Sequence, residues 1–109
     1  MASPFIAYDV SLALVRSVAP LLGVLNRRDP PLADQLRRAV QSVPLNVSEG
    51  NRRIGKDRPQ HFRHALGSAA EVQACLEVAE ALGYFRAPDF ADALAKADRA
   101  QRLLRGLTR

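Results

Sequence analysis

Aromatic residues and cysteine are scarce in this chain of 109 residues, and tryptophan is absent. Aromatic residues make up 6% of the sequence, and no segment shows the strict apolar–polar alternation of a half-buried strand. Alanine and leucine are abundant instead, which favours helices, because strands prefer β-branched and aromatic residues. The single cysteine, Cys75, excludes an intrachain disulfide and fits a reducing cytoplasm, and we expect it to be a small core or interface residue.

Long uninterrupted apolar runs are also missing. Asp9 and Arg16 interrupt the apolar residues between Met1 and Val24, so this segment does not have the continuous apolar core of a secretory signal. No stretch approaches the roughly 18 consecutive apolar residues of a membrane span. The sequence therefore predicts a soluble, cytoplasmic protein without a membrane partner.

The residue clusters that carry catalysis are lacking too. His61 and His64 lie three residues apart on one predicted helix face, but no third ligand of suitable type is near them. Glu49 has no nucleophile or second acid beside it, and the serines have no histidine placed for a triad. No glycine-rich phosphate loop is present. We therefore expect a protein that is not an enzyme and that binds no metal or cofactor.

What is present is a helical apolar period along most of the chain, at intervals of three and four residues. Short loops with proline, glycine and charged residues separate the periodic segments. The fold class predicted is all-α, and residues 1–109 form one domain, an antiparallel up-down-up-down four-helix bundle. Its helices are expected at about 8–26, 31–54, 58–83 and 88–107, after a loose lead-in at residues 1–7.

The second of these helices contains Pro44, yet its apolar period continues through the proline, which predicts one kinked helix. Because it runs antiparallel to the third helix about a turn near residue 56, facing residue numbers should sum to about 112. This register places Gly67 opposite Pro44, where it would allow close approach of the two backbones.

The same register gives the polar residues of the second helix partners on the third. Glu71 is expected to pair with Arg38, and Ser68 to lie near Asn46, with Ser42 close by. The carbonyl of Val40 loses its usual donor at Pro44, so Ser68 or a water molecule is expected to donate to it.

Basic residues outnumber acidic ones by sixteen to eleven, and fourteen of the sixteen are arginine. The topology gathers many of them at the end that holds the turn between helices two and three. Arginine binds phosphate in a bidentate manner, so this end is a candidate nucleic-acid surface. The candidate residues are Arg52, Arg53, Lys56, Arg58, Arg63, Arg102 and Arg105. Phe62, the one aromatic residue between Arg52 and Arg63, is assigned to the core, so binding would be led by phosphate contacts and poorly sequence-specific. A protein partner or a merely solvated face remain alternatives.

A combination of motifs resembles the "four helix bundle protein" family. The family pattern is R-A-x-x-S-I-P-x-N-I-A-E-G, followed by a basic turn, G-S-x-x-E and a late L-G-Y. This chain matches it closely over residues 32–86, with valine at 43 and 47 and serine at 48. The matching residues are Arg38, Ser42, Pro44, Asn46, Glu49, Gly50, Gly67, Ser68 and Glu71, with Leu82-Gly83-Tyr84 completing the pattern.

The resemblance implies a fold and an assembly more than an activity. Members of this family include proteins encoded in intervening sequences of large-subunit ribosomal RNA genes, some of which carry a ribosomal-protein name. A related branch is the accessory protein of diversity-generating retroelements, which partners a reverse transcriptase and RNA. Several members form ring-shaped homopentamers, and a ring would place five basic ends on one face.

Two hypotheses follow for this chain. The first is a non-enzymatic, oligomeric accessory protein that binds RNA or DNA through the basic end. The second is a protein-interaction scaffold, whose partner would be a protein such as a reverse transcriptase.

Overall fold

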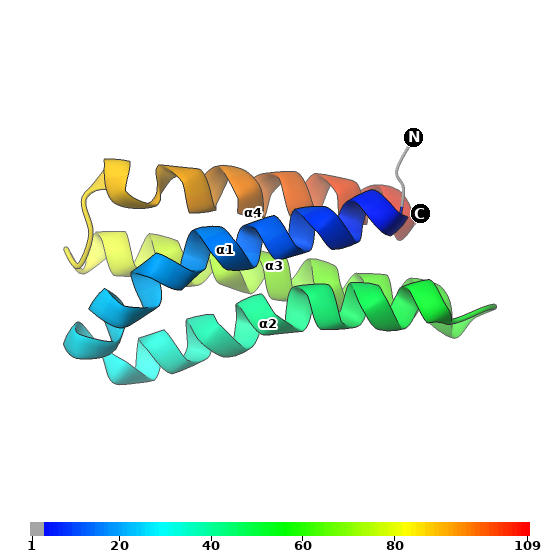
Figure 1. Cartoon of the computed structure of the whole chain (residues 1–109), viewed down its shortest axis with the longest axis horizontal. Coiled ribbons are helices and arrows are strands. Elements are labelled where there is room, and N and C mark those ends of the chain that lie inside the picture. The colour runs from blue at the N-terminus through cyan, green and yellow to red at the C-terminus, as the bar shows by residue number, and fades with distance from the viewer. Residues whose placement is uncertain (1–3) are drawn as a thin grey trace.

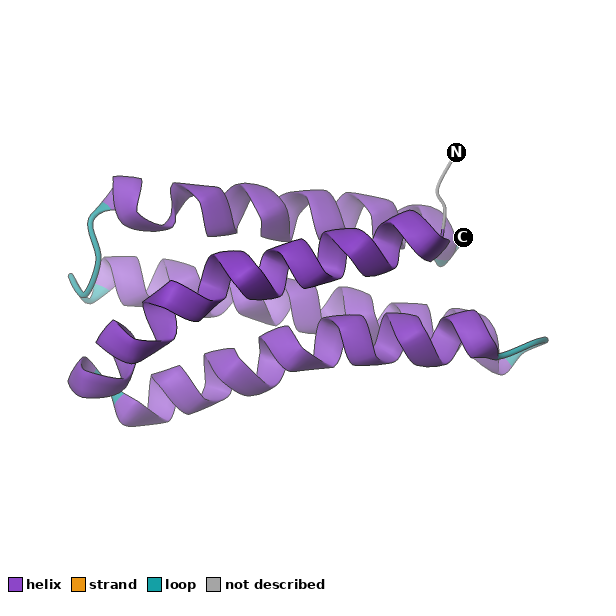
Figure 2. Cartoon of the chain, viewed as in Figure 1, coloured by secondary structure: helices purple, strands orange, loops and turns teal. Residues whose placement is uncertain are grey.

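Four helices make up nearly all of the computed structural model, which describes residues 4–109 (Figures 1 and 2). They are α1 (Pro4–Arg28), α2 (Pro30–Arg52), α3 (Asp57–Ala81) and α4 (Ala87–Leu107). No strand occurs in the described part of the chain. The all-α four-helix bundle predicted from the sequence is confirmed.

The helices run antiparallel along a bundle of 43 × 24 × 19 Å. Each helix packs against its neighbours in the chain, and α1 also packs against α4, which closes the bundle. The turn between α2 and α3 therefore lies at the same end as the start of α1 and the end of α4 (Figure 1). The α1–α2 and α3–α4 connections lie at the opposite end.

Local signals explain where the helices begin and end. The Asp29 carboxylate accepts the backbone N–H of Leu32 at 3.1 Å and so caps α2. The first two residues of α2 are prolines, which have no N–H that would need a partner. Asp89 accepts the N–H of Arg86 at 3.0 Å at the start of α4. Gly55 and Gly83 have φ of 91° and 79°, a left-handed conformation that glycine adopts without strain and that lets each chain segment turn after a helix.

Helix α1 begins earlier than the sequence suggested. Residues 4–7 of the expected loose lead-in are helical, and Ala7 is buried in the core; residues 1–3 lie outside the described part. Pro4 occupies the first helical position, where its missing N–H costs no hydrogen bond. Pro20 lies inside a continuous helix, whose last turns change direction in Figure 1.

The apolar character of α1 is also stronger than expected. An 18-residue window of this helix has a mean hydropathy of 1.6, so by length and composition alone it qualifies as a candidate membrane span. The sequence-based statement that no stretch approaches such a span was therefore too strong. A core helix passes the same test, and here Leu14, Val18 and Leu25 of α1 are fully buried against the other helices.

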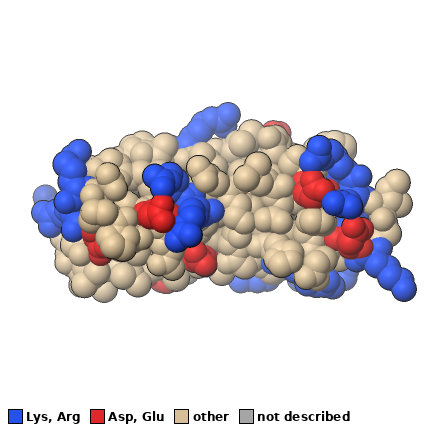
Figure 3. Space-filling view, turned by 90° about the horizontal axis from the view of Figure 1, so that it is seen from below, with Lys and Arg blue, Asp and Glu red and all other residues tan. Residues whose placement is uncertain are grey.

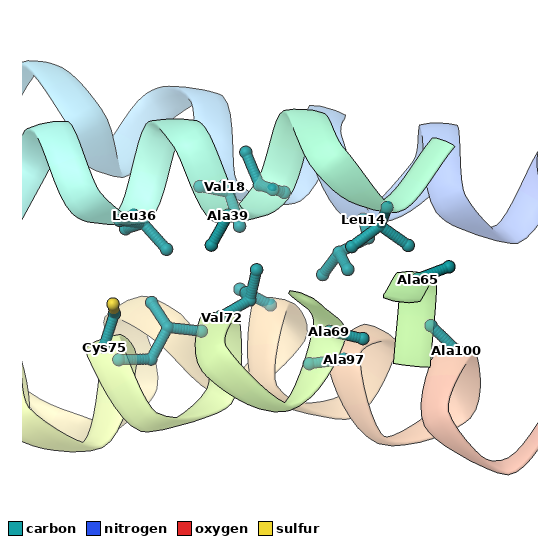
Figure 4. Close-up of a cluster of buried hydrophobic side chains, with 14 of the residues drawn as sticks. Leu14, Val18, Leu36, Ala39, Ala65, Ala69, Val72, Cys75, Ala97 and Ala100 are labelled. Atoms are coloured by element: carbon teal, nitrogen blue, oxygen red, sulfur yellow. The ribbon is translucent and has the colours of Figure 1, made fainter. Parts of the chain in front are cut away.

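The core is built from unequal contributions (Figure 4). Helices α1 and α2 supply mainly leucine and valine, such as Leu14 and Leu36, whereas α3 and α4 supply several alanines together with large side chains such as Phe62. Small side chains allow two helices to approach closely. Cys75 is 3% exposed and points towards Leu36, which confirms that it is a core residue.

Helix α2 continues unbroken through Pro44, with a gentle bend in its middle part (Figure 1). The predicted register against α3 is right, because Ser42 lies against Ser68 and Gly50 against Phe62. The glycine that permits close approach is Gly50, not Gly67: a Cβ on Gly50 would lie 2.6 Å from Cε1 of Phe62. Gly67 is exposed with nothing within 4 Å of such an atom, so the expectation that it makes room for the Pro44 bend is wrong.

Candidate nucleic-acid interface at one end of the bundle

Three polar residues of the family pattern form one hydrogen-bonded chain between α2 and α3. Ser68 donates to the hydroxyl of Ser42 at 2.7 Å, and the amide of Asn46 donates to the same hydroxyl and to the Ser42 carbonyl, both at 2.9 Å. The predicted proximity of Asn46 and Ser68 thus arises through Ser42. Ser68 does not donate to the Val40 carbonyl as expected, because its hydroxyl is engaged by Ser42.

Beside these hydrogen bonds lies an open cleft of about 410 Å³. Arg38 and Glu71 both line it, but they do not form an ion pair. Arg38 binds Asp34, one helical turn earlier, at 3.2 Å, and its side chain is 72% exposed. An intrahelical carboxylate four residues away is the nearer partner for a flexible side chain. Glu71 makes no ion pair within residues 4–109, so the predicted Arg38–Glu71 pair is wrong. The residues lining this cleft are Gln35, Arg38, Ala39, Ser42, Ser68 and Glu71.

Glu49 neutralises part of the predicted basic surface. Its carboxylate binds Arg52 at 2.5 Å and Arg53 at 2.7 Å. The hydrogen bonds from Arg52 and then Arg53 hold the pKa of the Glu49 carboxyl below its ordinary value. Arg53 also reaches Asp57 at 3.4 Å, which joins the end of α2 to the start of α3. Arg52 and Arg53 are therefore partly compensated cations.

Arg58 and Arg102 are also engaged within the chain. The guanidinium of Arg58 lies 5.4 Å from the centre of the Phe62 ring and donates to the Arg53 carbonyl at 3.4 Å. Arg102 binds Asp98 on its own helix at 3.1 Å. Of the seven candidate residues, Lys56, Arg58, Arg63 and Arg105 make no ion pair in the part of the chain that the structure describes, and only Arg58 among these four has the other contacts just given. Arg99 and Arg109 are likewise unpaired there and lie at the same end.

The net charge is concentrated in one half of the molecule. We call residues 4–15, 42–68 and 98–109 the basic half, and residues 16–41 and 69–97 the balanced half. The basic half holds nine of the sixteen basic residues and four of the eleven acidic ones, so it carries the whole net charge of +5. Figure 3 shows basic side chains mixed with acidic ones at both ends and left of the centre, and an uncharged stretch right of the centre.

Aromatic side chains that the sequence reading missed also lie in the basic half. Phe5 is 78% exposed, and with Tyr8 it lines an open cleft of about 350 Å³ between the first turns of α1 and the end of α2. The sequence predicts a loose lead-in at residues 1–7 and a helix that starts only at about Tyr8, so it does not place Phe5 beside Arg52. Pro4 as a helix-starting residue was the available signal.

The histidines give no sign of a metal site. His64 is within 3.2 Å of Gln60, a partner on its own helix. Across residues 4–109, no group of three His, Cys, Asp or Glu side chains is placed to hold a metal ion. The Cys75 thiol is not activated either, since burial, and then the charge of Glu71, raises its pKa.

A family model described as "23S rRNA-intervening sequence protein" matches residues 5–106, which is nearly the whole chain. The chain belongs to this family. The match extends the resemblance seen in residues 32–86 to the outer helices and agrees with the four-helix fold. The comparison with curated proteins found no match.

Proposed function

We propose that this protein is a non-enzymatic, oligomeric accessory protein that binds RNA through the phosphate backbone, using the basic half of the bundle. The observation that carries the proposal is the set of unpaired cations at one end: Lys56, Arg63, Arg99, Arg105 and Arg109. Each is exposed, so it can replace a cation condensed on an RNA phosphate without breaking an internal ion pair.

Oligomerisation would strengthen this binding. We propose a homopentamer, as the family resemblance implies, in which five basic ends share one face and their fields add. Light scattering measures the oligomeric state directly, and a monomer at micromolar concentration contradicts this part of the proposal. Because the proposed ligand is RNA, we also propose a cytoplasmic location.

The test of RNA binding compares two double variants that remove equal charge. Arg63→Gln with Arg105→Gln removes two unpaired cations of the basic half, and Arg16→Gln with Arg27→Gln removes two cations outside it. Fluorescence anisotropy with a labelled 20-base-pair RNA duplex measures the dissociation constant between 50 and 200 mM salt. We expect the first variant to bind at least about tenfold more weakly and with a smaller salt slope, and the second to change about twofold or less.

Two outcomes contradict the proposal. The first is binding that does not weaken with salt, because counterion release makes phosphate binding salt-dependent. The second is an equal loss in the two variants, which would mean that only net charge matters.

A protein partner is the second candidate function, because exposed apolar side chains lie in the same half. Ile54 is 94% exposed and Leu45 is 67% exposed. Apolar side chains at a surface mark protein contacts when they gather in a patch. A partner such as a reverse transcriptase would be captured by the wild type after nuclease treatment and lost in an Ile54→Ser variant.

A further inference from the structure

The open cleft between α1 and α2 combines aromatic, amide and charged groups that the phosphate-binding proposal does not use. It is lined by Phe5, Tyr8, Asp9, Ser48, Asn51 and Arg52. Its volume of about 350 Å³ lies within the range of about 300–1,000 Å³ typical of clefts for small molecules. It belongs to the basic half, beside the cations already described.

Two aromatic rings give the cleft an apolar face. Phe5 exposes 78% of its surface, although burying a phenylalanine side chain is normally favourable. Tyr8 is half-buried and packs against the hydrophobic core, so its ring is held in place. A fixed ring and an exposed ring at one cleft are the arrangement on which a planar ligand can stack.

Asn51 supplies a hydrogen-bonding group. Its Nδ2 donates to the Pro4 carbonyl at 3.2 Å, and this contact fixes the amide orientation because a carbonyl can only accept. Its Oδ1 is buried and has no partner among the described residues. This oxygen has no donor and is closed to solvent as the side chains stand, so a ligand in the cleft reaches it only after they shift.

The charges at the cleft favour a neutral base over a phosphate. The Asp9 carboxylate lines the cleft, and a carboxylate repels a phosphate placed inside it. The guanidinium of Arg52 is 73% exposed and bound to Glu49, so it lies at the edge, where phosphates of a strand would pass. The interior thus fits a planar group with N–H donors, and the edge fits an anion.

We infer that this cleft holds an unpaired nucleobase of a single-stranded RNA segment. The base stacks on Phe5 and Tyr8, the side chains around Asn51 shift so that an N–H of the base donates to its Oδ1, and the adjoining phosphates contact the exposed cations. Every base has a face for stacking and every RNA base has an N–H donor, so the cleft discriminates unpaired from paired RNA rather than one base from another. This inference rests on the proposed RNA binding and adds the form of RNA preferred.

The first test uses a labelled oligouridylate of 12 nucleotides and a 12-base-pair duplex as probes. Phe5→Leu keeps an apolar side chain but removes the ring, and Ile54→Leu is the matched control at another exposed apolar position. We expect Phe5→Leu to weaken binding of the single strand by about 5- to 100-fold, the range of one base–aromatic stack. Duplex binding should change by about twofold or less in both variants.

A second measurement reads the cleft directly through tyrosine fluorescence. The chain has two tyrosines and no tryptophan, so a Tyr84→Phe variant leaves Tyr8 as the one reporter. This substitution retains the ring that Arg28 covers at 5.9 Å. Saturating oligouridylate should quench the Tyr8 emission, and the duplex should not.

The outcomes separate this inference from the proposal on which it rests. If the duplex binds with the expected salt dependence but Phe5→Leu does not alter single-strand binding and Tyr8 is not quenched, the cleft inference fails alone. If Phe5→Leu weakens both probes equally, the ring does not select unpaired bases and the inference also fails. If neither probe binds at low salt, both proposals fail.

Discussion

The two ends of the bundle differ in how their charged groups are used. At the balanced end, Asp29 caps α2 with one carboxylate oxygen and accepts the Tyr84 hydroxyl at 3.1 Å with the other, while Arg28 covers the Tyr84 ring. At the basic end, α3 starts after Lys56 without a side-chain cap, and the cations exceed the carboxylates. Asp29 at the first end thus joins three structural contacts, whereas the basic end has five exposed cations, Lys56, Arg63, Arg99, Arg105 and Arg109, without an ion pair among the described residues.

The largest expected effect of a substitution comes from Asp29. Asp29→Ala removes the cap of α2 and the acceptor of the Tyr84 hydroxyl, and should lower the free energy of unfolding by about 2 kcal/mol. Asp29→Asn is the matched control, because it keeps a capping side chain without the charge and should cost less. Urea denaturation measures both variants. Equal losses would mean that charge, not capping, matters at the balanced end.

The next largest effect on stability is expected at Gly50, in the last turn of α2 at the basic end. Gly50→Ala places a methyl group against the buried Phe62 ring, and overpacking of this kind costs about 1–3 kcal/mol, offset by about 1 kcal/mol of helix propensity. Gly67→Ala meets open space on α3 and should instead stabilise by about 0.5–1 kcal/mol. Thermal or urea unfolding of the pair tests the sign. Stabilisation by Gly50→Ala as large as that by Gly67→Ala would contradict the close contact.

The pH dependence of stability should also distinguish the ends. The pKa of Glu49 is lowered in the folded protein, mainly by the Arg52 hydrogen bond, so its contribution is present above its ordinary pKa of 4.5 and is lost as the pH falls through the folded value. The pKa of Tyr84 is raised, mainly by its bond to Asp29, so its contribution is complete below about 10 and is lost as the pH rises further. The urea midpoint of Glu49→Gln should approach that of the wild type only at acid pH. The urea midpoint of Tyr84→Phe should approach that of the wild type only at alkaline pH. A difference from wild type that did not vary with pH would argue against these pairings.

The smallest effect is expected from Arg38. Its exposed pair with Asp34 should contribute at most about 0.5 kcal/mol, so Arg38→Ala should leave the unfolding midpoint nearly unchanged. A loss above about 1 kcal/mol would show that Arg38 binds Glu71 across the cleft in solution. This variant separates the contribution of a surface ion pair in the balanced half from that of the Asp29 cap.

The sequence was sufficient to predict the helices, their antiparallel order and their register. Apolar spacing and capping residues act locally, and the short α2–α3 turn fixes which residues face each other, as Ser42 and Ser68 show. Partner choice was not predictable in the same way. Arg38 had two carboxylates within reach, Asp34 and Glu71, and periodicity does not rank rotamers.

The candidate site could be predicted only in part, because its side-chain partners, like those of Arg38, do not follow from periodicity. The sequence placed the cations at one end, but it did not show that Glu49 would bind both Arg52 and Arg53. It also treated Phe5 as part of a lead-in, so the cleft beside Arg52 was missed. A site made by the ends of two helices depends on where each helix starts, and such boundaries are poorly determined by sequence.

The connection between α1 and α2 consists of Asp29 alone, since α1 ends at Arg28 and α2 begins at Pro30. So short a hairpin brings two long helices together at a small cost in loop entropy. During synthesis, the strongly apolar α1 would gain a covering partner as soon as α2 has left the ribosome. Contacts between chain neighbours then build most of the bundle, and the late pairing of α1 with α4 completes a topology of the kind that folds rapidly.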